Sequence, residues 1–338
     1  GGMCLGQCLP YITLVSVQLV FAGHSLLIHH ELSGSVSVVA FAVYREIGAT
    51  ACFVAAIAAI EPRERWPQLE HARLFLLAGG SMGGQLTLML LALKATRPGL
   101  VTFLQPVMPL FVALLAWCYY RDRLRRKQMG GMALCMAGTY LLASSTEGPG
   151  SLDFGALIAV LQTLVGANYL VMQKPLIRVG YSPLVVAGGS YVVALLLTSI
   201  IGVINYVASM TEVGEVQWWG SSPLYPVAVA YAILLMSVYN YIAMAWVTQK
   251  AGPTVVALAN LLQGLFANAA EVFLFSRRLG LAEILGALVL SAGFIAFILA
   301  TPRCEDEAEA SLATCQASAD TPPPSARLGD PVTIGSRE

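Results

Sequence analysis

Charged side chains are scarce in this sequence. Asp, Glu, Lys and Arg make up 11% of its 338 residues, whereas a soluble globular chain typically carries about 25%. Hydrophobic residues account for 57% of the chain, and its mean hydropathy is +0.72. Positive and negative charges balance at a net charge of zero, and we expect no nucleic-acid partner. The low charge excludes an ordinary soluble domain and favours a protein surrounded by lipid.

The residues that usually perform catalysis or bind metals are also few. There are four histidines, the last of them His71, and seven cysteines without a CxxC motif. The GGSMG stretch at residues 79–83 matches the G-x-S-x-G pattern of hydrolases, but that motif needs a strand-to-helix turn and a later histidine. We interpret it as small-residue spacing for close helix packing. We therefore predict that the protein is not an enzyme and has neither a metal site nor a cofactor.

What the sequence does contain is a series of long apolar runs. A helix of about 20 apolar residues crosses a bilayer, whereas barrel strands would be about half as long and would alternate. Because backbone groups in lipid must be paired within the protein, runs of this length predict helices. We predict an all-α integral membrane protein with ten transmembrane helices, near residues 9–29, 36–60, 74–93, 99–120, 128–145, 154–173, 183–207, 224–248, 253–275 and 281–300.

Lysine and arginine are distributed unevenly between these runs. With the N-terminus placed in the cytoplasm, fourteen of the nineteen basic residues fall in cytoplasmic loops or the tail, four fall in outer loops, and Arg45 lies within a span. An excess of basic residues on the cytoplasmic side is the general rule, so we predict that both termini are cytoplasmic. Residues 1–8 read as a short N-terminal segment without a visible secretory signal. Residues 301–338 are polar and Pro-rich, which predicts a disordered cytosolic tail.

The two halves of the apolar region resemble each other. Residues 98–143 align without gaps on residues 253–298 at a shift of 155, which superimposes Gly131 and Gly138 on Gly286 and Gly293. Five helices in each half is an odd number, so the second half must enter the membrane upside down. This pattern predicts inverted repeats at residues 9–145 and 146–300, with a binding site near the midplane between them. At a shift of 144, the residues Gln18, Ser25 and His29 match Gln162, Tyr169 and Gln173.

Polar residues within the spans are the candidates for a solute path. At about 100° per residue, four polar residues share one side of the predicted helix at 253–275, and the three matched positions of each half share one helix face. A polar face in lipid must contact protein or water; the alternative is hydrogen bonding that only holds the bundle together. Two prolines beside Gln105 would loosen the run at 99–120. The candidates are Gln18, Ser25, His29, Arg45, Gln105, Gln162, Tyr169, Gln173, Asn260, Gln263, Asn268 and Glu271.

Arg45 and Glu46 are adjacent opposite charges inside an apolar run. Neighbouring helix positions point about 100° apart, so we expect the two not to make their best pair with each other. We predict that Arg45 faces the central cavity, where Glu271 or a substrate carboxylate neutralises it, and Glu46 is its local partner or a proton site. Glu46 and Glu271 are the candidate proton-coupling groups. The alternative is a charge cluster that only fixes this helix against its neighbours.

The sequence resembles the EamA-type drug/metabolite transporter superfamily, and within it the plant nodulin-like, Walls-Are-Thin-related branch. The resemblance rests on VQLVFAGHSLLIH, on VYREIGAT, on a Pro-containing fourth helix, on Asp122 and on a Gly-rich fifth helix, and covers roughly residues 10–300. The second half departs from the pattern at Arg277, which stands where the first half has Asp122. The resemblance implies a ten-helix transporter of small organic solutes, in plants often amino acids or auxin-related compounds.

We expect a secondary transporter that moves a small neutral, zwitterionic or carboxylate metabolite, such as an amino acid, by alternating access. The alternatives are a phosphorylated-sugar or nucleotide-sugar translocator, a channel, and a non-transporting scaffold or receptor. A phosphate would require several Lys or Arg residues in the cavity, and only Arg45 is placed for that role, with Lys250 at a helix end. The expected partners are a small-molecule solute and the lipid bilayer, and a homodimer is left open.

The basic residues predict that the loop at residues 121–127 and the tail face the cytoplasm. In a background without native cysteines, a single cysteine at either place should resist an impermeant thiol reagent added outside intact cells and react after permeabilisation. Labelling from outside at either place would overturn this orientation.

Overall fold

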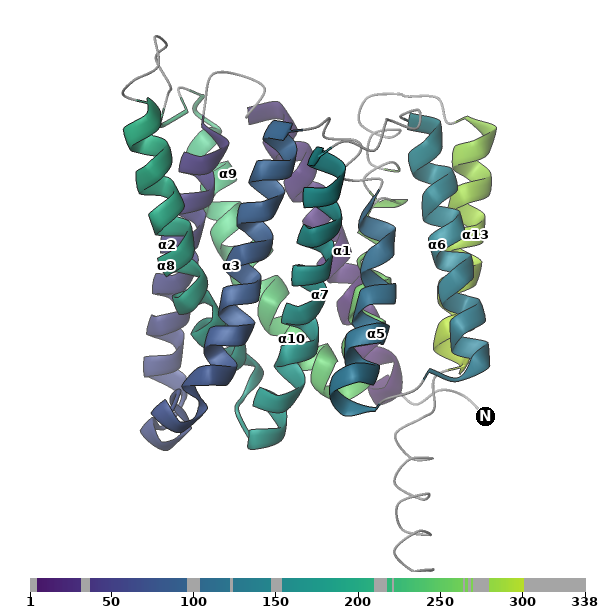
Figure 1. Ribbon diagram of the computed structural model, residues 1–338, viewed down its shortest axis with the longest axis horizontal. Helices are drawn as coiled ribbons and strands as arrows, with labels where there is room; N and C mark the ends of the chain where they lie inside the picture. The colour runs from purple at the N-terminus through teal and green to yellow at the C-terminus, as the bar shows by residue number, and fades with distance from the viewer. Residues whose placement is uncertain are drawn as a thin grey trace, which may run out of the picture.

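The computed structural model describes residues 5–31, 37–95, 104–121, 124–146, 154–209, 218–220, 222–263, 265–266, 269 and 280–300. Within these ranges the chain is helical apart from turns and short connections, and no strand occurs in them. The first helices are α1 (Leu5–Glu31), α2 (Val38–Ile60), α3 (Ala72–Ala95), α5 (Met108–Tyr120), α6 (Arg126–Thr146), α7 (Phe154–Val179) and α8 (Pro183–Ser209). The others are α9 (Tyr225–Tyr231), the π-helical segment η4 (Ala232–Tyr239), α10 (Asn240–Ala251), α11 (Pro253–Ala259) and α13 (Leu281–Ala300), all shown in Figure 1.

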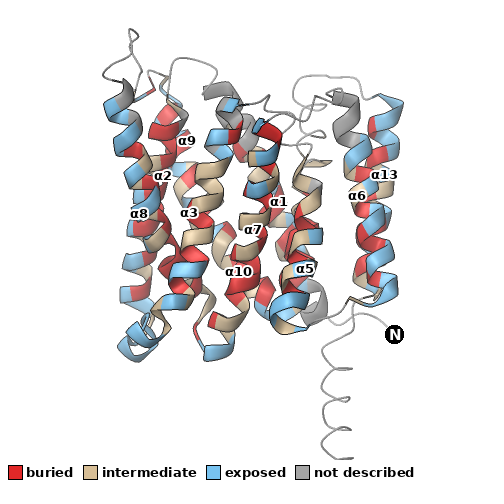
Figure 2. Ribbon diagram, in the orientation of Figure 1, coloured by how far each residue is buried: buried red, intermediate tan, exposed pale blue. Residues whose placement is uncertain are grey.

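Several of these helices have the length and composition of membrane spans. In the described part of the chain these are Val39–Ile60, Phe154–Val179, Pro183–Ile204, Tyr225–Ala251 and Leu281–Ala300, with shorter apolar helices at Leu9–His24 and Met108–Tyr120. Figure 2 shows buried positions concentrated on the faces turned toward other helices, with exposed positions outside. Many exposed positions are large and apolar, such as Leu196, Val203 and Leu299. A surface of this kind suits lipid, and the predicted all-α integral membrane class is confirmed.

Two predicted helices are interrupted in the structure, and a third stays helical but contains a π-helical segment. The run at 99–120 contains a short 3-10 turn, η3 (Gln105–Val107), before α5 begins. The run at 253–275 forms α11 only as far as Ala259, followed by a turn at residues 260–261. The run at 224–248 contains η4 between α9 and α10. Prolines explain the first interruption, because each lacks an amide hydrogen and its ring crowds the preceding turn.

The helices form a bundle in which some lie in front of others, α8 in front of α2 and α6 in front of α13, with the α6–α13 pair at one edge (Figure 1). Next to α3 lie α7 and α8, while α2 packs on α8 and η4, and α1 packs on α10. The turn between α7 and α8 reverses the chain through Gly180, whose φ of 106° favours glycine. The contacts of α3 with α7 and α8, of α2 with α8 and η4, and of α1 with α10 each join a helix of residues 9–145 to a helix of residues 146–300.

The pair α6 and α13 packs with almost no space between the backbones. A Cβ atom added at Gly131 would lie 2.7 Å from the Phe297 backbone nitrogen, and one at Gly293 would lie 2.6 Å from that of Cys135. Gly138 faces the backbone of Leu290 in the same way. A shift of 155 exchanges the Gly138–Leu290 and Cys135–Gly293 contacts. The small residues predicted to allow close packing therefore lie at the interface between these helices.

Replacing Gly131 by alanine should destabilise the protein, because its Cβ would push against the α13 backbone and overpacking typically costs about 1–3 kcal/mol. Gly130 is the matched control, since a Cβ there meets nothing within 4 Å. The Gly130→Ala protein should be as stable as the parent or slightly more so, because alanine favours helix by about 1 kcal/mol over glycine. Thermal unfolding in detergent measures both; equal midpoints for the two variants would contradict the packing argument.

Candidate functional site

An amide pair joins α1 to the end of α11. Gln18 is fully buried, and its Nε2 donates to Asn260 Oδ1 at 3.0 Å. Asn260 follows the last residue of α11 and lies at the turn that interrupts this helix. Interrupted helices at the membrane midplane commonly form binding sites in transporters, because their free backbone groups line a cavity.

A second amide pair joins η3 to α7. Gln162 is 1% exposed, and its Oε1 accepts from Gln105 Nε2 at 3.4 Å. The sequence shifts relate this pair to the first, since Gln18 corresponds to Gln162 at 144 and Gln105 corresponds to Asn260 at 155. In both pairs, a glutamine from a long helix, Gln18 of α1 or Gln162 of α7, contacts a residue at the point where another helix is interrupted. The sequence predicted all four residues as candidates, and the structure brings them together in two equivalent contacts.

The structure joins Arg45 to its neighbour in the sequence. Arg45 Nη2 donates to Glu46 Oε1, so of the alternatives left open Glu46 is the local partner, and the expectation that the two would not make their best pair is not met among the described residues. The reason is the length of the side chain. The angle of about 100° between neighbouring helix positions describes the directions of their Cβ atoms, whereas the arginine side chain is long enough to fold back over the next residue. Arg45 Nη1 also lies 3.6 Å from Met236 Sδ in η4. The proposed partner Glu271 lies outside the described residues.

Three tyrosines from different helices lie beside this ion pair. The rings of Tyr191 in α8 and Tyr241 in α10 are 5.1 Å apart, and Tyr169 in α7 lies 5.9 Å from Tyr241. The charges of Arg45 and Glu46 act on both Tyr191 and Tyr241. Tyr191 and Tyr241 were not among the sequence candidates, although a tyrosine within an aliphatic span was a signal that could have identified them.

Several buried polar atoms at these positions have no ordinary hydrogen-bond partner in the described part of the chain. A buried donor or acceptor left in this way costs about 1–3 kcal/mol, and a folded protein normally satisfies nearly all of them. Within the described part of the chain, such atoms lie on α1, α2, α7 and α8, with others on α9 and α10. Those on the candidate residues and their neighbours are Gln18 Oε1, Arg45 Nε, Glu46 Oε2, Gln162 Nε2, the hydroxyls of Tyr169 and Tyr191, and both amide atoms of Gln173.

The remaining sequence candidates have different outcomes. Gln263 is half-buried, and its backbone nitrogen donates to the Asn260 carbonyl at 3.2 Å. The predicted polar stripe assumed one continuous helix, and the interruption at residues 260–261 breaks that geometry. The side chains of Ser25 and His29, together with Asn268 and Glu271, lie outside what the structure describes. A search of the described residues finds no group of His, Cys, Asp and Glu suited to a metal ion.

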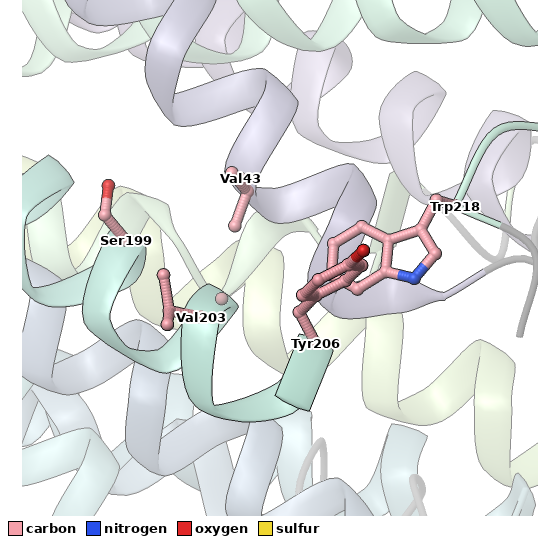
Figure 3. Close-up of a pocket in the computed structure, with 6 residues that line it drawn as sticks. Val43, Ser199, Val203, Tyr206 and Trp218 are labelled. Atoms are coloured by element: carbon pink, nitrogen blue, oxygen red, sulfur yellow. The ribbon is translucent and has the colours of Figure 1, made fainter. Parts of the chain in front are cut away.

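One apolar pocket lies between α2 and α8, away from these polar groups (Figure 3). It has a volume of about 260 Å³ and is lined by Val43, Ser199, Gly202, Val203, Tyr206 and Trp218. Val43 precedes Arg45 by two residues, or about 200° around the helix, so the two point in nearly opposite directions. The Tyr206 and Trp218 rings meet edge to face at 5.1 Å. The pocket therefore belongs to the lipid-facing side of α2 and α8, and it contains none of the candidate residues.

Known proteins share both the sequence pattern and the fold. Residues 9–144 match the EamA-like transporter family. The chain is 23% identical over 323 residues to the WAT1-related protein At5g64700 of Arabidopsis thaliana, covering 84% of this chain and 88% of that protein. A crystal structure described only as that of a protein has the same fold, with a TM-score of 0.70 and 18% identity over 88% of this chain and 99% of that one.

These similarities indicate the class of protein. They support a multi-pass integral membrane transporter and point to transport rather than catalysis. The predicted resemblance to the EamA-type superfamily, and within it to the plant WAT1-related branch, is confirmed by these matches.

Removing one member of the Arg45–Glu46 pair should destabilise the protein, because a buried charge would be stranded at a typical cost of about 3–5 kcal/mol. Arg45→Gln and Glu46→Gln should each lower the yield of monodisperse protein, and the double variant should recover it. Size-exclusion profiles and thermal unfolding in detergent measure the effect. A double variant no better than the worse single variant would show that the two charges do not compensate each other.

Proposed function

We propose that the protein is a secondary transporter with ten membrane helices in two inverted repeats, residues 9–145 and 146–300. The observation that carries this proposal is the pair of equivalent contacts Gln18–Asn260 and Gln105–Gln162. Each contact joins one half to the other, and the sequence shifts exchange them. The equivalent glycine contacts of α6 and α13 support the same symmetry.

The two amide contacts suit an alternating-access mechanism. Because each links opposite halves, rocking one half against the other would open one contact while the other holds. A polar solute entering on the open side would then supply hydrogen bonds to the amide groups that had lost theirs. The π-helical segment η4 lies beside the ion pair, and such segments often occur at functional sites.

The solute we propose is a small zwitterionic or carboxylate metabolite with an apolar or aromatic part. Arg45 is the one buried lysine or arginine among the described side chains, and Glu46 already neutralises it. The pair nevertheless keeps an unpartnered donor, Arg45 Nε, and an unpartnered acceptor, Glu46 Oε2. One donor and one acceptor match a carboxylate and an ammonium group better than the double charge of a phosphate. The rings of Tyr169, Tyr191 and Tyr241 offer apolar surface beside them.

Glu46 is also the proton-coupling group that we propose. Its Oε2 is buried and has no hydrogen-bond partner among the residues that the structure describes, so a proton could be held there while Oε1 stays with Arg45. The basic residues support a cytoplasmic position for both termini and for the bundle end that carries residues 61–71 and the α5–α6 connection.

Counterflow in proteoliposomes tests this function. Purified protein is reconstituted with unlabelled neutral amino acids or aromatic carboxylates inside, and labelled solute is added outside. A carrier should accumulate label transiently above equilibrium, because exchange is faster than net flux. Label that only equilibrates downhill would identify a channel, and no uptake of any solute tested would favour a scaffold or receptor.

A tyrosine pair separates solute binding from folding. The Tyr169 hydroxyl lies near Gln173 but makes no hydrogen bond of ordinary geometry, so Tyr169→Phe should keep the parent's stability and raise KM severalfold. The control is Tyr181→Phe, since that hydroxyl contacts His71 Nδ1 at 2.9 Å and accepts from the Gln68 backbone at 3.1 Å. The control should lose stability and keep its KM. An unchanged KM in Tyr169→Phe would remove this residue from the solute path.

A further inference from the structure

A continuous series of rings lies at the end of the bundle where α2 and α9 begin, opposite to residues 61–71 (Figure 1). Tyr44 and Trp219 meet edge to face with 5.5 Å between ring centres, and Trp219 meets Tyr225 in the same way at 5.0 Å. Tyr225 in turn meets Phe41 at 6.1 Å, and Phe41 lies 6.2 Å from the ring of His24 in α1. This ring series therefore connects α1, α2 and the start of α9.

The ring series lies about one helical turn beyond the Arg45–Glu46 pair. Phe41 precedes Arg45 by four residues, so the two side chains lie on the same face of α2. Arg45 also contacts Met236 of η4, and the chain enters η4 directly from α9. His24 is buried close enough to Arg45 for the arginine charge to act on it. The rings thus stand between the ion pair and the nearer end of the bundle.

The packing of the series is tightest around Tyr225. Its ring is fully buried and forms an apolar cluster with Phe41, Ala228 and Val229. The backbone before α9 lies against the same ring, because a Cβ atom added at Gly220 would be 2.4 Å from Tyr225 Cδ2. Glycine at position 220 therefore permits a close contact that fixes the position of the ring.

Two contacts of the series join the halves of the chain. Tyr44 and Phe41 lie within residues 9–145, whereas Trp219 and Tyr225 lie within residues 146–300. Contacts between rings depend on packing and on weak ring electrostatics rather than on paired charges. Motion of one half against the other could therefore separate these rings without stranding a charge in the bilayer.

We propose that the ring series is a gate that closes the solute path on the side that we place away from the cytoplasm. This inference rests on the proposed transport function. The gate is closed in this structure, since Arg45 and Glu46 beneath it are both buried. Tyr225 holds it closed, because its ring contacts both Trp219 and Phe41. When the halves rock apart, the rings separate and a polar solute can reach the ion pair from that side.

Access of an impermeant thiol reagent tests the gate without requiring transport. In a background without native cysteines, Ser237→Cys places a reporter that differs from serine by one atom at a fully buried position of η4, next to Met236. The reagent is added outside intact cells, and the labelling rate is measured. Tyr225→Ala should raise this rate about tenfold, because labelling follows the fraction of open protein. Tyr225→Phe keeps the ring and should label like the parent.

Further variants make the result specific to the ring series. Trp219→Ala removes an exposed ring of the series and should raise the rate severalfold, even if Tyr225→Ala folds poorly. Phe154→Ala is the matched control, since it removes an exposed ring outside the series, at the same end of the bundle where α7 begins (Figure 1). Its labelling rate should equal that of the parent.

Unchanged labelling in both Tyr225→Ala and Trp219→Ala, or an equal rise in Phe154→Ala, would overturn the gate. Failure of the gate and failure of the transport function can be told apart, because labelling needs no solute. Faster labelling of the two gate variants in a protein that fails the counterflow test would support the closure over the ion pair and reject only the proposed transport. Counterflow without any change in labelling would do the reverse.

Discussion

A lipid bilayer offers no hydrogen bonds, so every polar side chain that enters it must be matched by the protein or by what the protein carries. The two amide contacts, Gln18 with Asn260 and Gln105 with Gln162, meet this constraint in part. Within the described part of the chain, each contact leaves one buried amide atom without a partner, Gln18 Oε1 in the first and Gln162 Nε2 in the second. The interior is therefore held together by polar contacts that remain able to bind something else, which is the requirement of a site that must repeatedly open and close.

Helices with different roles carry different residues. The pair α6 and α13 packs through glycines against backbone, which favours one fixed distance. By contrast, α1, α2, α7, α8 and α10 bring glutamines, an ion pair and tyrosines together. In the proposed mechanism, rigid support beside a polar interior would let the polar helices move without loss of the whole bundle. The π-helical η4 places Met236 against Arg45, so an irregular helix and the buried charge pair lie at the same place.

Basic residues have different surroundings inside the bundle and at its end. The buried Arg45 is paired within the described interior, because an uncompensated charge there would cost several kcal/mol. Around Tyr120 and Trp117, by contrast, Lys174, Arg178 and Arg121 lie over aromatic rings. Arginine thus stabilises the interior through an ion pair with its neighbour and packs on aromatic rings at the end of the bundle.

Hydropathy and spacing determined the membrane class, most helix positions, the glycine interface and four residues of the amide contacts. These are local properties, because the length of an apolar run and the period of a helix are written in consecutive residues. Which residues contact one another was decided only by the tertiary structure. Gln18 and Asn260 are 242 residues apart, and Tyr191 and Tyr241 meet because α8 packs on α10. The Arg45–Glu46 contact needed the structure for another reason: helix period fixes where Cβ points, whereas the path of a long side chain depends on the neighbours that surround it.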